Sequence, residues 1–285
     1  MKIYKTRSIL RLATLCCCLF ALVFSNDLQA QDQPENVFVA MWCIKAKTQD
    51  AMSLIKNDIK PFEESLIKKG LSMDWILMRT EFPSGNECKC DYYSMQVFSD
   101  HKLLEFFSNR EKVMAHFTKT FPDKDPVKLM ERFKAAIDDG GTQVYYLQDV
   151  VVPGPTGGQF VTVNYMNVAA GNEGAYAKME NEVFKPVHKE AVAQGYMKDW
   201  VLMQRIMPRG TDFDGNFITV DVHGSMENAM RPVPSEIWKK VHPDVDQNEM
   251  YRKMAKLREL KRAELWQFVM KADRPKEDKD ATSSN

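Results

Sequence analysis

The sequence has no excess of charge of either sign. Its 285 residues include 39 Lys and Arg and 39 Asp and Glu, so the formal net charge at pH 7 is zero. A domain that binds nucleic acid usually carries a basic patch facing the phosphates, and this composition gives no sign of one. We therefore expect no nucleic acid or other polyanion as a partner.

Catalytic motifs are also missing. The chain contains no glycine-rich phosphate loop, no nucleophile motif and no His and Cys residues at metal-ligand spacing. Its five histidines are dispersed. The sequence therefore names no reaction class, predicts no metal and leaves open whether the protein is an enzyme.

The one long hydrophobic run lies at the N-terminus. Four basic residues precede an apolar run at residues 12–24, which ends near Ala30. This pattern is typical of a secretory signal peptide, here residues 1–30, with cleavage after Ala30. The run has 13 residues, whereas a membrane-spanning helix needs about 20, so we expect export to the periplasm or the extracellular space and no membrane span after cleavage. A lipid on one of the three cysteines at residues 16–18 is a minor alternative.

Three cysteines remain after cleavage, namely Cys43, Cys88 and Cys90. An oxidising compartment favours one disulfide and one remaining thiol. Three free thiols are the alternative. Metal binding is less favoured, because no spaced histidines complete a site.

The chain matches itself at a separation of 125 residues. A second block recurs at 121 residues, so the second copy lacks four residues between the blocks. Matches at this many positions indicate a duplication. The first block pairs Lys60-Pro61 with Lys185-Pro186, Gly70 with Gly195, Asp74-Trp75 with Asp199-Trp200, Leu77-Met78 with Leu202-Met203 and Pro83 with Pro208; the second pairs Pro122-Asp123 with Pro243-Asp244.

The duplication sets the expected domain organisation. We predict a first repeat at residues 35–152 and a second at residues 159–272. A linker rich in Pro and Gly, residues 153–158, joins them, and the polar residues 273–285 form a disordered tail.

Each copy has a readable order of elements. Strands are expected at residues 37–44, 74–81, 92–98 and 144–152, and helices at 49–69, 101–118 and 126–137. In the second copy, residues 160–168 and 265–270 match the first and last strands. Pro61 and Pro186 fall inside the first helix of each copy, where a proline should kink or restart it. Trp75 and Trp200 are expected in the core.

This order, βαββαβ, is that of the ferredoxin-like fold, in which both helices cover one face of a four-stranded antiparallel sheet. Two such units in tandem can bury their free sheet faces against each other. In these respects the chain resembles the dimeric α+β barrel superfamily, as a tandem fused pseudo-dimer. The resemblance covers nearly all of the chain after residue 30, and it rests on element order and duplication alone.

The resemblance implies an α+β fold and little more. The superfamily includes cofactor-free monooxygenases, haem proteins with two fused repeats, and small stress or catabolic proteins. The sequence itself requires no cofactor, haem is an alternative, and homo-oligomer formation stays open.

The two copies differ on the first helix. Glu180 of the second copy replaces Ile55 of the first, at a position flanked by apolar residues. Tyr176, Glu180, Phe184 and His188 are spaced by four and so share one helical face. We predict that Glu180 lies against the sheet with a raised pKa, unless a cation or donor offsets its burial. A solvent-exposed helix edge is the alternative.

The third strand has one polar face in both copies. Thr219, Asp221 and His223 alternate with apolar residues, as Ser94 and Gln96 do in the first copy. Asn164 and Gln204 are expected to join them from neighbouring strands. Such groups line either a cavity or a satisfied hydrogen-bond network.

These residues form the candidate site. We favour a binding protein for a small amphipathic molecule. The alternatives are an enzyme with His188 or His223 as general base and Glu180 or Asp221 as orienting carboxylate, haem bound by one of the two histidines, and a purely structural barrel. The candidate ligand-binding residues are Tyr176, Glu180, His188, Asn164, Gln204, Thr219, Asp221 and His223.

The expected fold also pairs cysteines. The first and third strands are antiparallel neighbours, so Cys43 comes beside Cys90 and, less closely, Cys88. Cys88 bonded to Cys90 in a local ring is a further alternative. Cys90 is an even number of residues before Ser94 and Gln96, so by parity it shares their sheet face. A Cys43–Cys90 bridge therefore predicts Val39 and Met41 on this polar face and, by the 125-residue shift, Asn164 as well.

Overall fold

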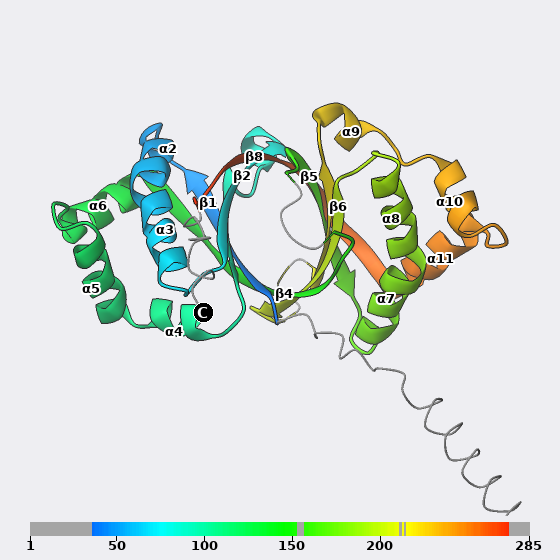
Figure 1. Ribbon diagram of the computed structural model, residues 1–285, viewed down its shortest axis with the longest axis horizontal. Helices are drawn as coiled ribbons and strands as arrows, with labels where there is room; N and C mark the ends of the chain where they lie inside the picture. The colour runs from blue at the N-terminus through cyan, green and yellow to red at the C-terminus, as the bar shows by residue number, and fades with distance from the viewer. Residues whose placement is uncertain (1–35, 153–156, 211–212, 214, 274–285) are drawn as a thin grey trace, which may run out of the picture. The chain divides into compact units, whose positions relative to one another are not determined.

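The strands of the chain form a closed antiparallel barrel (Figure 1). A computed structural model describes residues 36–152, 157–210, 213 and 215–273. The predicted signal peptide and most of the predicted linker and tail lie outside these residues. In chain order the strands are β1 (Phe38–Ala46), β2 (Asp74–Phe82), β3 (Tyr92–Phe98), β4 (Ile137–Val150), β5 (Phe160–Val168), β6 (Asp199–Met207), β7 (Phe217–His223) and β8 (Arg258–Lys271).

Equivalent strands take the same order in the two halves of the barrel, which we define as residues 36–152 and 157–273. The first half is ordered β4-β1-β3-β2, and the second is ordered β8-β5-β7-β6. The pairs β4–β6 and β2–β8 close the barrel. The fold is therefore of the α+β class with an eight-stranded antiparallel sheet, as the element order predicts.

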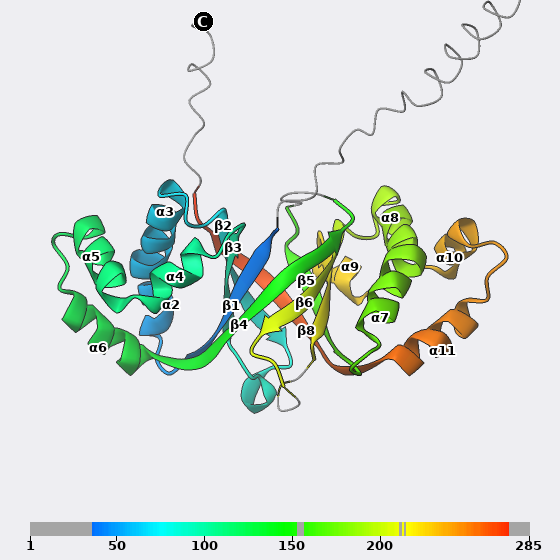
Figure 2. The same ribbon diagram turned by 90° about the horizontal axis from the view of Figure 1, so that it is seen from below.

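Helices cover the outer face of the sheet in each half, and the barrel lies between the two helical groups (Figure 2). No helix among the described residues is long and apolar enough to cross a membrane. The helical segments are α2 (Asp50–Leu54), η1 (Ile55–Ile59), α3 (Lys60–Lys68), α4 (Lys102–Ser108), α5 (Arg110–Thr120) and α6 (Pro126–Ala136) in the first half, and α7 (Glu173–Met179), η3 (Glu180–Phe184), α8 (Lys185–Ala193), α9 (Met226–Met230), α10 (Ser235–Val241) and α11 (Gln247–Leu257) in the second.

The prolines of the first helices mark a change of helical geometry. Pro61 and Pro186 stand at the start of α3 and α8, and each is preceded by a five-residue π-helical segment, η1 or η3. A proline has no N–H to give to the preceding turn, so the chain widens there and α-helical bonding restarts. The predicted restart is confirmed.

Three other expected elements differ from the structure. The helix expected at residues 101–118 is two helices, because Asn109 adopts an extended conformation and its side chain caps α5 by accepting from the Lys112 N–H. The strands β4 and β8 each span 14 residues and begin before their expected starts. Both are long because each pairs with its own half and then with the other.

Side chains alternate between the barrel interior and the helix-covered face. Interior residues include Val39, Met41 and Tyr93. Trp75 and Trp200 lie beneath the helices of the first and second half, with exposed fractions of 0% and 1%. Both tryptophans are core residues, as predicted.

A disulfide joins Cys43 to Cys90, with Cα atoms 5.4 Å apart, and Cys88 is a buried thiol. Gly140 leaves room for it, since a Cβ there would lie 2.1 Å from the Cys43 sulfur.

The face assignment drawn from this bridge is wrong. Val39 and Met41 point into the barrel, whereas Ser94 and Gln96 face the helices beside Trp42 and Ala40. The parity argument fails because Cys90 precedes β3, which begins at Tyr92, and the alternation of a strand does not extend to residues outside it.

Candidate functional site

A cavity of about 720 Å³ lies in the first half, between the helices and the outer face of β1, β3 and β4. This volume is within the range of small-molecule sites, roughly 300–1,000 Å³. The candidate residues that we selected by comparing the two repeats all lie in the second half instead.

Most of the cavity wall is apolar. Aromatic rings come from every side, among them Trp42 on β1, Phe62 on α3, Phe117 on α5 and Phe133 on α6. Leu104, Phe107 and Met130 line the cavity and are also 38–46% exposed. The apolar lining therefore continues to the protein surface, which gives an apolar ligand a way in.

Glu63 is a buried carboxyl group in this wall. It stands on α3 with an exposed fraction of 6%, and the Gln96 Nε2 donates to its Oε2 at 2.6 Å. Burial raises the pKa of Glu63 to about 7, and the hydrogen bond from Gln96 opposes that rise in part. Near neutral pH this carboxyl can therefore either donate or accept a proton.

Ser94 lies two residues before Gln96 on the same face of β3 and also lines the cavity. The Trp75 Nε1 donates to its hydroxyl oxygen at 2.8 Å. On the neighbouring strand, the Trp42 Nε1 donates to Asp139 at 2.7 Å.

An ion pair closes another part of the wall. The Asp58 carboxylate, on η1, lies 2.7 Å from Lys124 Nζ, which also donates to the Asn57 carbonyl at 3.0 Å. Lys124 belongs to the turn between α5 and α6, so the pair ties this turn to the first helix. The repeat offsets place Val183 and Val245 at these positions in the second half.

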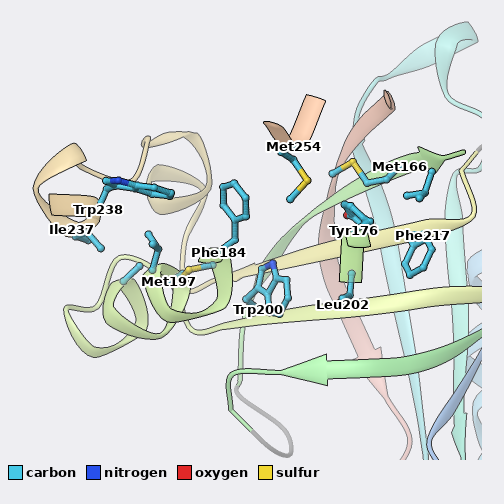
Figure 3. Close-up of a cluster of buried hydrophobic side chains, with 13 residues drawn as sticks. Met166, Tyr176, Phe184, Met197, Trp200, Leu202, Phe217, Ile237, Trp238 and Met254 are labelled. Carbon is cyan, nitrogen blue, oxygen red and sulfur yellow. The ribbon is translucent and has the colours of Figure 1, made fainter. Parts of the chain in front are cut away.

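In the second half, Glu180 is buried under its helix, with an exposed fraction of 5%. Burial raises the pKa of Glu180 to about 7; the nearby Tyr176 and Arg258 oppose this rise, and Asp221 adds to it. The predicted burial and the direction of the pKa shift are confirmed. The core of this half, however, is a buried hydrophobic cluster that includes Tyr176, Trp200 and Phe217 (Figure 3).

Asp221, Asn164 and Thr219 form a hydrogen-bond network. The Asn164 amide lies 3.1 Å from the Asp221 carboxylate and 3.2 Å from the Thr219 hydroxyl. Burial raises the pKa of Asp221 to about 6, and Asn164 partly offsets it. Of the two predicted roles for this polar face, the hydrogen-bond network describes these three residues, whereas the buried Nδ1 of His223, on the strand of Thr219 and Asp221, has no partner among the described residues.

The histidines and Gln204 stand apart from this network. The partly buried His188 stacks on Trp200 with ring centroids 5.2 Å apart, and burial lowers its pKa to about 4. His223, at the end of β7, lies 3.4 Å from the Thr162 hydroxyl, and burial lowers its pKa as well. Gln204 accepts from Gln148 of β4 at 2.9 Å. The structure therefore leaves His188, His223 and Gln204 in separate contacts, whereas it brings together the other five candidates, namely Tyr176, Glu180, Asp221, Asn164 and Thr219.

Sequence reasoning missed Glu63, although a signal was present. The 125-residue offset places it at the position of His188, one turn after the buried Ile59. A charged residue at that spacing within an apolar stripe predicts a buried carboxyl group, as it did for Glu180.

Haem does not fit the cavity well. Haem iron is usually held by His, Cys, Met or Tyr, and among the residues that line the cavity only Met114 and Met130 are of these types. His188 is packed on Trp200 within the second-half core. Within the described parts of the chain, no three His, Cys, Asp or Glu side chains gather as a metal site.

Comparisons with known proteins add little. No protein-family model matches the chain, and no curated protein matches its sequence. A Fusobacterium nucleatum protein provisionally named a monooxygenase is 9% identical, with a TM-score of 0.47, over 84% of this chain and 95% of that one. An anthrone oxidase-like protein is 9% identical, with a TM-score of 0.48, over 84% and 93%.

A mutant chlorite dismutase from Candidatus Nitrospira defluvii is 12% identical, with a TM-score of 0.44, over 82% of this chain and 91% of that one. Because their TM-scores are below 0.5, these three structures carry no argument about this chain.

Proposed function

We propose that the chain is an exported protein that binds a small, mainly apolar molecule in the first-half cavity, with Glu63 as the polar anchor. The observation that carries this proposal is the buried carboxyl of Glu63 in an apolar cavity of about 720 Å³. A site with an apolar wall and a few convergent polar groups is typical of small-molecule binding.

The chemistry of Glu63 narrows the ligand. Below pH 7 the neutral carboxyl can donate a hydrogen bond, and above pH 7 the carboxylate accepts one or attracts a cation. A ligand hydroxyl or amine is therefore favoured over a carboxylate, which the ionised Glu63 would repel.

A cofactor-free enzyme on the same site is the second candidate. A general acid or base works best when its pKa lies near the working pH, and the pKa of Glu63 is about 7. In this version Glu63 takes the role that the sequence assigned to His188 or His223, and Gln96 orients its carboxyl.

Fluorescence titration with N-phenylnaphthylamine, a neutral apolar probe with one N–H, tests the proposal on the exported form with its disulfide intact. We expect saturable binding whose affinity changes with pH around 7. Glu63→Gln should bind without that pH dependence, while the matched control Glu111→Gln, at an exposed position on α5, should behave as wild type. Absence of binding, or an unchanged pH profile in Glu63→Gln, would overturn the assignment.

Export and cofactor content need separate measurements. Mass spectrometry of the secreted protein should give a chain that begins at Gln31, and a retained Met1 or a lipid would contradict the signal-peptide prediction. An absorption spectrum with a Soret band would restore haem as the ligand. Periplasmic or extracellular localisation and homo-oligomer formation stay predictions.

A further inference from the structure

We infer that Ser94 selects ligands that carry a hydrogen-bond acceptor, such as a ketone oxygen, and that Trp75 positions its hydroxyl for this task. The inference rests on the proposed function, because it concerns the same cavity. It adds a second recognition point beside Glu63 and thereby narrows the ligand class.

The first step concerns the direction of the Ser94 hydroxyl. A serine hydroxyl has one proton and two lone pairs. The Trp75 Nε1, which can only donate, occupies one lone pair at 2.8 Å, and the Trp75 ring is fully buried. Ser94 must therefore act as the acceptor in this contact, and its proton is left for another partner.

The second step concerns where that proton can go. Ser94 lies on β3, whose backbone is paired with Trp42 of β1 on one side and with Leu77 of β2 on the other. Within the described part of the chain, no backbone carbonyl accepts from the Ser94 hydroxyl, whose recorded contact is the one with Trp75. Among the described residues no side chain accepts from Ser94, and the residue lines the cavity. The proton is thus free to be donated to a ligand.

The third step places this donor relative to Glu63. Ser94 and Gln96 are two residues apart on one strand face, a spacing of roughly 7 Å, and Gln96 holds the Glu63 carboxyl. The cavity therefore presents a donor and a titratable carboxyl beside an apolar wall. A flat apolar molecule with an acceptor at one position and a hydroxyl or amine a few ångströms away complements it.

The second half differs at both positions. Thr219, which corresponds to Ser94, is contacted by Asn164, and Trp200, which corresponds to Trp75, stacks on His188. In the second half, therefore, the amide of Asn164 donates to the threonine hydroxyl in the way that the Trp75 indole donates to Ser94 in the first, and the Trp200 ring face is covered by His188.

A matched pair of fluorescent probes tests the inference on the exported protein. Acedan is a naphthalene with a ketone and a dimethylamino group, and its analogue has an ethyl group in place of the acetyl group. We expect wild type to bind acedan about tenfold more tightly than the analogue, the effect of one hydrogen bond. The acedan emission should be red-shifted in wild type relative to Ser94→Ala, because a hydrogen bond to the ketone lowers the energy of its excited state.

The variants separate recognition from structure. Ser94→Ala should bind both probes alike, Ser94→Thr should keep the preference, and Trp75→Phe should weaken it because the hydroxyl is no longer oriented. The control Ser72→Ala, whose hydroxyl donates to the Asp74 and Val97 carbonyls, should discriminate as wild type does.

The outcomes distinguish the two proposals. If wild type binds both probes with equal affinity and without the red shift, the role of Ser94 is wrong while the cavity stands as a binding site. If wild type binds neither probe nor N-phenylnaphthylamine, the cavity function fails and the inference fails with it.

Discussion

The two halves of the barrel share a strand order but use the space under their helices differently. The first half has a cavity of about 720 Å³ there. In the second half, Phe184 packs against Trp238, with ring centroids 5.9 Å apart, in a buried cluster that includes Trp200 (Figure 3). The half-exposed Tyr251 also packs against Phe184, with ring centroids 5.4 Å apart. The corresponding first-half residues are Ile59, Phe117 and Met130, all of which line the cavity.

The difference shows what creates a site on this fold. Both sheets provide a polar strand face, and both first helices carry a buried carboxyl group, Glu63 or Glu180. Larger rings on the covering helices turn one space into core, whereas smaller side chains leave the other open. Helix side chains, more than the sheet, therefore decide whether this architecture can hold a ligand.

The largest effect should come from removing a ring of the second-half core. Trp200→Ala should lower the free energy of unfolding by about 3–5 kcal/mol, because it leaves a large void in a packed cluster. Phe107→Ala, at the exposed rim of the first-half cavity, should cost less than about 1 kcal/mol. Urea denaturation measures both, and similar losses would contradict the contrast between the halves.

The buried carboxyl of the second half should make stability depend on pH. The pKa of Glu180 is raised from 4.5 to about 7, so the stabilisation of its protonated form is present below pH 4.5 and is lost as the pH rises through about 7. Glu180→Gln should reduce the difference in the free energy of unfolding between low and high pH by about 3 kcal/mol. Denaturation at pH 5 and at pH 8 measures it, with the exposed Glu182→Gln as control; equal slopes in wild type and Glu180→Gln would refute the effect.

Exchanging two side chains should fill the first-half cavity as the second half is filled. The double substitution Ile59→Phe and Met130→Tyr introduces the second-half residues and should weaken probe binding by about tenfold or more, because the rings occupy the cavity. Fluorescence titration measures the affinity, and a melting curve checks that the variant is folded. Unchanged affinity in a folded variant would mean that the probe binds elsewhere.

The smallest effect should come from the ion pair of the first half. The double substitution Asp58→Val and Lys124→Val reproduces the second half and should change the free energy of unfolding by less than about 1 kcal/mol, because Lys124 is 38% exposed and the attraction of the pair little exceeds the desolvation cost of Asp58. Lys124→Val alone should cost more, since it leaves Asp58 without its cation. Urea denaturation of both variants measures these losses. A loss of more than about 1 kcal/mol in the double variant would show that the pair itself is stabilising.

The sequence predicted the architecture better than the site, for physical reasons. Duplication and strand periodicity lead directly to the strand order, since these patterns repeat along the chain. An empty volume has no such pattern: it depends on the summed size of Phe184, Trp238 and Tyr251 against their counterparts. Replacement of Ile55 by Glu180 drew attention to the second half, although a polar substitution says nothing about space.

Asn164 was grouped correctly with its neighbours on the sheet, although the sequence offset used to place it was wrong. It contacts Thr219 and Asp221 as expected, but the 125-residue shift from Val39 is not the reason. In the strand registers, Trp42 pairs with Ser94 and Asn164 pairs with Thr219, so the first strands are offset by 122 residues. Offsets read from conserved turns do not carry over to a strand when the connecting loop changes length.

The pairing of β2 with β8 has a consequence for how the chain reaches its native state. It joins residues as distant as Ile76 and Lys271, and contacts of such long sequence separation form slowly. We expect barrel closure to be a late folding event that waits for the last strand. A chain cut before Arg258 would keep β2 and β5 as open edges, and unpaired edges of this kind favour aggregation over refolding.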